Sequence, residues 1–279
     1  MSLTSTPSVA DRSAPAAGAT GTTPGPPARP PRSAPSARAR VGVRLLGVAA
    51  LAAIVADVVL GLWVTPPDEF MGNLVRLLYI HPALAWVMYV AYGVSFLSSL
   101  LYLWRRTCAA RWDRLAGASS EVGVVFTGLT LVTGSIWGRP TWGAWWTWDP
   151  LLTTTALLFV LYLGYLAVRR IPGDAETRGR RSAIAALVAF VDVPIAYFSV
   201  LWWRSLHQTP TVDNPINGKT AIHGSMAWTL LLSFVAFSLA YLWLVVHRCR
   251  LAVLAEREEH EGLLLAIEQR HAEAGDVPR

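Results

Sequence analysis

The chain has 279 residues, of which 53% are hydrophobic and only 15% are charged, and its formal net charge is +6. The charged fraction lies well below the roughly 25% of soluble proteins, and the apolar residues stand in long blocks rather than at amphipathic spacing. This composition excludes an ordinary soluble domain. It predicts an all-α membrane protein, because a hydrocarbon core about 30 Å thick is crossed by about 20 apolar residues in a helix.

The N-terminal segment, residues 1–40, is rich in Pro, Ala, Ser, Thr and Gly. Such a segment does not bury enough apolar area to order itself, so we predict a disordered tail. It is too long and too rich in proline for the n-region of a signal peptide, and the apolar block after it is full-length. The first helix is therefore expected to remain as an anchor.

Six apolar blocks follow, each long enough to cross a membrane. The second begins at His81-Pro82 and the fourth at Asp149-Pro150, where proline suits the first turn of a helix. Asp149 is also a favourable helix cap, which we prefer to a catalytic role. The predicted helices cover residues 41–64, 82–104, 119–137, 151–168, 183–203 and 222–246. They form a transmembrane domain at 41–247, followed by a charged, helical surface tail at 248–279.

Arginine is unevenly distributed between the loops, and this asymmetry predicts the orientation. Cytoplasmic loops carry the excess of Lys and Arg, so the arginine-rich side is expected to be cytoplasmic, together with both termini, Cys108 and Cys249. Segments 65–81, 138–150 and 204–221 then lie outside the cytoplasmic membrane. Because the basic residues stand in membrane loops, we expect no nucleic-acid partner. The arginine-rich loops carry Arg105, Arg106, Arg111, Arg114, Arg169, Arg170, Arg178, Arg180 and Arg181.

The outer segment 137–150 is exceptionally rich in tryptophan. Tryptophans at a membrane interface usually form an aromatic belt, which suffices for Trp63, Trp104, Trp202 and Trp203. A belt does not account for the density at 137–150, which favours a platform for a flat apolar cofactor. If this stretch were helical, three of its rings would share one face through their spacing. The tryptophans are Trp137, Trp142, Trp145, Trp146 and Trp148, and those at 142, 145 and 146 have that spacing.

Two histidines, His81 and His207, stand at predicted helix ends on the same outer side. Imidazole is a common axial ligand of haem iron, although a lone interfacial histidine is more often a hydrogen-bonding bystander. The planar fork of arginine suits the carboxylates of haem propionates. Candidate partners for them on this side are Arg76, Arg139 and Arg204, and a further histidine, His223, stands near the start of the sixth helix.

Other features keep alternatives open. Asp57 and Asp192 fall inside apolar blocks, where acidic residues are functional candidates. They motivate an ion-coupled transporter, although no inverted repeat or paired broken helices support one. A redox protein with haems on both sides is less well matched, because the cytoplasmic interface offers only His247. The chain lacks a GxxxxGK[ST] loop, so energy from ATP would have to come from a partner.

Three quoted segments together resemble a known family. "WGAWWTWDP" followed by "LLTTTALLFVLYLGYLA" resembles the tryptophan-rich WWD signature of haem-handling membrane proteins, and "RLLYIHPALAW" and "DVPIAYFSVLWWRSLHQ" resemble its flanking histidine motifs. Length, six helices and the order of motifs match the CcmC family of cytochrome c maturation over residues 42–247. The resemblance implies that His81 and His207 ligate the iron of haem b from opposite sides. It assigns the edge of the macrocycle to Trp142, Gly143, Trp145, Trp146, Trp148 and Asp149, and Arg76 is placed in the same site.

The resemblance also implies a pathway. Haem would be passed to the haem chaperone CcmE, which attaches it to its own histidine. The partners would be the transporter subunits CcmA and CcmB and the small membrane protein CcmD, and the chain itself would not be an enzyme. A CcsA-type haem-attachment component is the alternative, since CcmF and CcsA share the signature but normally have more helices. The Pro-rich N-tail, the charged C-tail and His223 have no counterpart in the family pattern.

Overall fold

The computed structural model describes residues 37–69, 71–207, 222 and 224–275. Within these ranges six helical spans are long and apolar enough to cross a membrane, and the described residues form no strand beyond one isolated bridge, between Asp68 and Gly72. The predicted all-α membrane fold is thereby confirmed. The spans are Arg40–Val64, Asn73–Leu103, Ala110–Trp142, Pro150–Arg169, Ala175–Trp202 and Ser225–His271. His223 and most of the predicted N-terminal tail lie outside the described residues.

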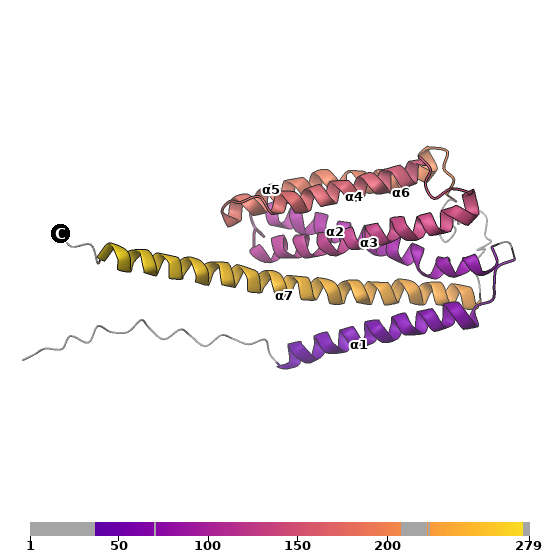
Figure 1. The fold of residues 1–279 in the computed structure, drawn as a ribbon, viewed down its shortest axis with the longest axis horizontal. Coiled ribbons are helices and arrows are strands. Elements are labelled where there is room, and N and C mark those ends of the chain that lie inside the picture. The colour runs from indigo at the N-terminus through magenta and orange to yellow at the C-terminus, as the bar shows by residue number, and fades with distance from the viewer. Residues whose placement is uncertain (1–36, 70, 208–221, 223, 276–279) are drawn as a thin grey trace, which may run out of the picture. The chain divides into compact units, whose positions relative to one another are not determined.

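Seven α-helices and two short helical turns among the described residues make up these spans (Figure 1). The first span ends in a π-helical turn, η1, and the second begins with a 3-10 helix, η2, while two helices share the fifth span. The elements in chain order are α1 (Ala37–Val59), η1 (Leu60–Val64), η2 (Asn73–Tyr79), α2 (His81–Leu103), α3 (Ala110–Trp142), α4 (Pro150–Arg169), α5 (Ala175–Phe190), α6 (Asp192–Trp202) and α7 (Ser225–Gly275).

Helix α3 is longer at both ends than the predicted 119–137. Its polar start is held by tertiary contacts, because Arg169 at the end of α4 forms a bidentate ion pair with Asp113, with N–O distances of 2.6 and 3.0 Å. At the other end the helix passes through Pro140 and stops at Trp142. Hydropathy does not detect either extension, since the added residues are polar or interfacial.

The fifth and sixth spans also differ from the prediction. The fifth divides at Val191, and Pro194, which lacks an N–H, cannot bond the carbonyl of Phe190. Helix α7 spans 51 residues and continues through the charged tail without a break near residue 248. Two ion pairs join this polar part to α3: Arg114–Glu256, at 2.8 Å, and Arg248–Glu121. The described part of the tail, residues 248–275, is therefore helical and continuous with the last membrane span, and ion pairs hold it to α3.

The core is built from α2 to α7 around the pair of α2 and α3, with α4 to α6 packed on one side of this pair (Figure 1). Tyr92 bonds Thr127 at 2.6 Å and Ser95 bonds Ser120 at 2.7 Å across the interface. A Cβ on Gly123 would lie 2.8 Å from the Tyr92 ring, so the ring requires a glycine there. Small and hydroxyl residues let membrane helices approach closely, and this close pairing fixes the end of α3 against the start of α2.

Helix α1 packs along α7 (Figure 1). The side chain of Asp57 is buried in this contact, and Ser233 of α7 donates a hydrogen bond of 2.6 Å to its carboxylate. Asp57 therefore has a structural partner in the neighbouring helix.

Candidate functional site

Four helix ends meet at one end of the bundle (Figure 1). They are the start of α2, the end of α3, the start of α4 and the segment after α6, and α3 packs against both α2 and α4 while α4 packs against α6. These four ends carry His81, Trp142, Asp149 and His207 in turn. Residues far apart in the sequence are thereby brought to one region, as the alternating topology predicts.

His81 is the first residue of α2 and lies against α3. Its Nδ1 is 3.0 Å from the hydroxyl oxygen of Thr133, and that hydroxyl donates to the carbonyl of Leu129 at 2.8 Å. Because a hydroxyl has one proton, its oxygen must accept from the Nδ1–H of the imidazole. The lone pair of His81 therefore resides on Nε2, on the opposite side of the ring.

The surroundings of His81 fix the orientation of its ring. A Cβ on Gly134 would come within 3.0 Å of the imidazole Cε1, so the ring rests against the backbone of α3. Trp137, less than one turn further along α3, meets the ring edge-on with centroids 5.8 Å apart. The imidazole is thus packed against α3 and hydrogen-bonded to it.

His207 follows α6 and is held by the residue that starts α4. Its Nδ1 lies 3.3 Å from Oδ1 of Asp149, and a carboxylate is only an acceptor, so the imidazole donates from Nδ1. Its lone pair also resides on Nε2. The ring of Trp142 meets the imidazole with centroids 4.7 Å apart. The two histidines are therefore held in the same way, and they lie within electrostatic range of each other.

Asp149 connects the residues around His207 through several hydrogen bonds. Its carboxylate caps α4 by accepting from the N–H of Leu151 at 3.0 Å, and it also accepts from the Ser205 hydroxyl at 3.1 Å and the Leu206 N–H at 2.6 Å. The predicted helix cap is confirmed. The side chain is only 2% exposed, so all of its bonding capacity is directed at protein groups.

The charges of Asp149 and His207 follow from these contacts. Burial would raise the pKa of the Asp149 carboxyl, but the Leu206 N–H, the Ser205 hydroxyl and other donors outweigh it and hold the pKa below its ordinary value. Burial lowers the pKa of His207 despite the attraction of Asp149. At neutral pH the carboxylate is ionised and the imidazole is neutral, which is the form that binds a metal.

The tryptophan-rich segment is not a continuous helix. Gly143 adopts φ = +81°, a left-handed conformation that favours glycine, and its N–H bonds the Arg139 carbonyl at 3.1 Å to end α3. The condition under which Trp142, Trp145 and Trp146 would share a helical face is therefore not met. Trp142 joins His207, whereas the other three rings lie in the following segment and are exposed. They are Trp145 at 59%, Trp146 at 36% and Trp148 at 83%.

The three candidate arginines have different surroundings. Arg76 donates to the carbonyls of Gly61, at 3.0 Å, and Leu62, and so caps the end of the first span. Arg139 donates to the Gly143 carbonyl at 2.8 Å. Arg204 is exposed, and the described part of the chain offers it no hydrogen bond or ion pair. Of the three, Arg204 is the one whose guanidinium is most accessible to an added anion.

Sequence reasoning missed Thr133, Gly134 and Ser205. Thr133 and Gly134 precede Trp137 by four and three residues, so in a helix they share its face. That spacing could have identified the pair as neighbours of whatever Trp137 contacts. Ser205 stands two residues before His207 and carries no comparable signal.

Comparisons with known proteins show which family the chain belongs to. Residues 28–263 match the family model "Heme exporter protein C". The Heme exporter protein C of Bradyrhizobium diazoefficiens is 36% identical over 210 residues, which is 74% of this chain and 78% of that protein. The Haemophilus influenzae protein of that name is 37% identical over 200 residues, 71% of this chain and 79% of its own.

The chain belongs to the haem exporter protein C family. A plant relative, a putative cytochrome c biosynthesis ccmC-like mitochondrial protein of Arabidopsis thaliana, is 35% identical over 212 residues, 73% of this chain and 78% of its own. The resemblance found from the histidine and tryptophan motifs is thereby confirmed. The chain's relatives therefore include bacterial haem exporters and a plant protein of cytochrome c biosynthesis.

Proposed function

We propose that the chain binds haem b at the outer face of the cytoplasmic membrane, with His81 and His207 as axial ligands, and presents it for transfer to CcmE in haem export for cytochrome c biogenesis. One observation carries the proposal. Each imidazole has its Nδ1 engaged by a protein acceptor, Thr133 or Asp149, so that Nε2 keeps its lone pair. Metal-binding histidines characteristically donate their other ring N–H in this way.

The two ligands differ in strength. A carboxylate partner makes an imidazole a better donor to iron than a neutral hydroxyl does, so His207 is the stronger ligand and His81 the weaker. A protein that passes haem onward benefits from this asymmetry, since one bond is released first. The bond between iron and His81, whose ring packs against Trp137 and bonds Thr133, would therefore break first.

The exposed rings supply the surface for the macrocycle. Trp145, Trp146 and Trp148 present exposed apolar area in the segment between Trp142 and Asp149, the two residues that contact His207, and Trp146 and Trp148 meet edge-on with centroids 5.8 Å apart. A flat apolar porphyrin is suited to such a surface. The propionates would be met by Arg204, while Arg76 and Asp149, which bond protein groups, would shape the site without touching haem.

The orientation and partners complete the proposal. The arginine distribution supports termini in the cytoplasm and the histidines outside. The transporter subunits CcmA and CcmB would help to supply haem and would provide the ATP hydrolysis. CcmD would assist the transfer of haem to CcmE. The chain acts as a haem-presenting platform and not as an enzyme.

The test is the formation of covalent haem on CcmE in cells that also express this chain. His81→Ala and His207→Ala are each expected to abolish it, whereas His247→Ala, near the middle of α7, is the matched control and should leave it intact. Normal haem loading of CcmE with both ligand variants would refute the proposal. Transfer of haem directly to an apocytochrome without CcmE would instead favour the CcsA-type alternative.

A second function is motivated by one observation. In the described part of the chain, Oδ2 of Asp192 is buried and has no hydrogen-bond partner, and buried acids in membranes often serve proton or ion transfer. An ion-coupled transporter predicts solute uptake in vesicles that Asp192→Asn abolishes and that does not depend on Trp145 or Trp146. Intact haem delivery by Asp192→Asn would leave haem presentation as the function.

A further inference from the structure

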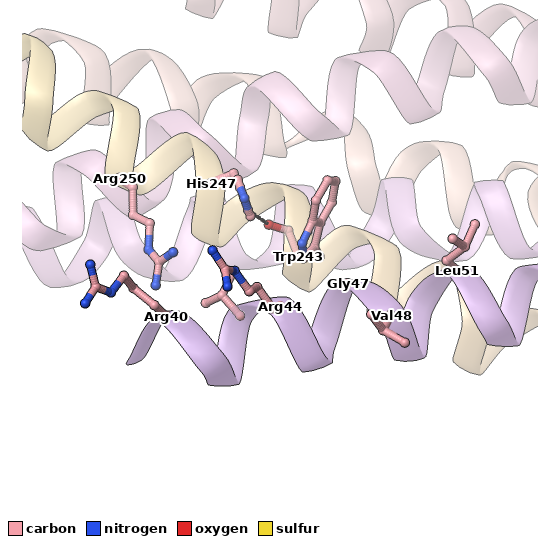
Figure 2. Close-up of a pocket in the computed structure, with 9 residues that line it drawn as sticks. Arg40, Arg44, Gly47, Val48, Leu51, Trp243, His247 and Arg250 are labelled. Atoms are coloured by element: carbon pink, nitrogen blue, oxygen red, sulfur yellow. Dashed lines mark hydrogen bonds between the residues drawn. The ribbon is translucent and has the colours of Figure 1, made fainter. Parts of the chain in front are cut away.

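A cavity of about 530 Å³ lies between the N-terminal half of α1 and the middle of α7 (Figure 2). Arg40 and Arg44 are one turn apart on α1, and Arg250 lies on α7. Figure 2 shows Arg44 reaching toward α7 and Arg250 reaching toward α1, so the guanidinium groups gather in the gap. The residues that line the cavity are Arg40, Val43, Arg44, Gly47, Val48, Leu51, Trp243, His247 and Arg250, with no acidic side chain among them.

Close packing and a hydrogen bond hold the inner wall of this cavity in place. A Cβ on Gly47 would lie 2.5 Å from Nε1 of Trp243, so only glycine allows the indole to pack against α1. His247 donates from Nδ1 to the carbonyl of Trp243 at 3.0 Å, and the two rings stand with centroids 4.4 Å apart. The cavity is thus a defined feature of the α1–α7 contact.

The lining changes character along the helix axis. Arg40 begins the first membrane span and Arg44 stands one turn inside it, whereas Val48 and Leu51 lie deeper and are exposed toward the lipid. A cation-rich mouth above an apolar wall matches a molecule with an anionic head and a hydrocarbon tail. Basic pockets between membrane helices bind the phosphate groups of anionic lipids.

We propose that this cavity binds the phosphate headgroup of an anionic phospholipid, with its acyl chains lying along Val48 and Leu51. The guanidinium groups of Arg40, Arg44 and Arg250 would hold the phosphate oxygens, to which arginine forks are well matched. The bound lipid would brace α1 against α7, the helix that α1 packs along. This site is separate from His81 and His207 and does not depend on haem binding.

The test is lipid binding to the purified full-length protein, measured by native mass spectrometry with dioleoyl phosphatidylglycerol, dioleoyl phosphatidylcholine and inorganic phosphate as probes. Phosphatidylglycerol should bind at least about tenfold more tightly than phosphatidylcholine, and phosphate alone should bind weakly. Each arginine near an anionic lipid contributes about a fivefold factor in affinity. The variant carrying Arg40→Gln, Arg44→Gln and Arg250→Gln should therefore bind phosphatidylglycerol about 100-fold less tightly.

The matched control removes the same charge outside the cavity, through Arg38→Gln, Arg105→Gln and Arg106→Gln. It should change the affinity less than about twofold; an equal loss in the control would mean general charge attraction and overturn the site. Phosphate binding as tight as that of phosphatidylglycerol would indicate a free-anion site and overturn the lipid assignment. If the triple variant does not fold, Arg44→Gln alone should weaken binding about fivefold, and an unchanged affinity would refute the proposal.

Discussion

The substitution Asp149→Asn tests how the protein prepares His207 to bind iron. Asparagine caps a helix as well as aspartate does, so the start of α4 is expected to persist. The charge and the second acceptor oxygen are lost, although the carboxylate of the native protein serves the N–H of Leu206 and Nδ1 of His207 at once. The imidazole would then lose the partner that fixes its tautomer and increases its basicity.

The size of this effect follows from related metal sites. Loss of such a partner typically weakens metal binding by about 10–100-fold, or roughly 1.4–2.8 kcal/mol. Removal of the negative charge also takes away the attraction that favours a protonated His207, so its pKa moves further down and protonation does not mask the result. The expected outcome is weaker haem binding by a histidine that remains neutral.

The assay is titration of the haem-free protein with haem, followed by the Soret absorbance. The control is Asp174→Asn, the same exchange at the cap of α5, where the carboxylate accepts from the Thr177 N–H. The control should bind haem as the wild type does. A dissociation constant for Asp149→Asn within twofold of the wild type, with a normal spectrum, would show that the Asp149–His207 contact does not support a ligand.

Three further predictions concern the same site. Burial lowers the pKa of His207 below the ordinary histidine value of about 6.5. As the pH falls below about 6.5, the unfolded state therefore binds a proton that the folded state does not bind, and the free energy of unfolding decreases. Thermal melts should show a lower melting temperature in this pH range, and a smaller decrease in His207→Ala. Gly134→Val places a branched side chain where a Cβ alone reaches 3.0 Å from His81, so it should displace the imidazole and weaken haem binding about tenfold or more, read by Soret titration, while Gly128→Val, whose Cβ would stay 3.5 Å from its neighbour, should not. Replacing Trp145 and Trp146 together with alanine should accelerate haem loss to a scavenger without affecting membrane insertion, and unchanged loss would eliminate the platform.

Hydropathy predicted the six spans because lipid forces each helix to be apolar along its length. It failed at the start of α3, where polar residues are stabilised by the ion pair between Asp113 and Arg169 instead of by lipid. It also did not reveal the division of the fifth span at Val191. Both features depend on contacts between helices, which a window of sequence does not contain.

Only those parts of the site that depend on local sequence signals were predictable. The cap at Asp149 was predictable because the signal of Asp149-Pro150 is local. Residue type and topology predict His81 and His207 as ligands, which stays a prediction. The partner of His81, Thr133, depends on how closely α2 approaches α3 and was not foreseen. The glycine after Trp142 is a common helix stop, and this signal should have argued against one helical face for the tryptophans.

The absorption spectrum of the purified protein from haem-replete cells, beside those of His81→Ala and His207→Ala, tests the central claim most directly. Two neutral imidazoles bound through Nε2 predict a Soret band and a six-coordinate low-spin spectrum for the wild type. Each variant should lose that spectrum, with the greater loss of haem in His207→Ala. A wild-type protein without haem, or an unchanged spectrum in both variants, would contradict the account.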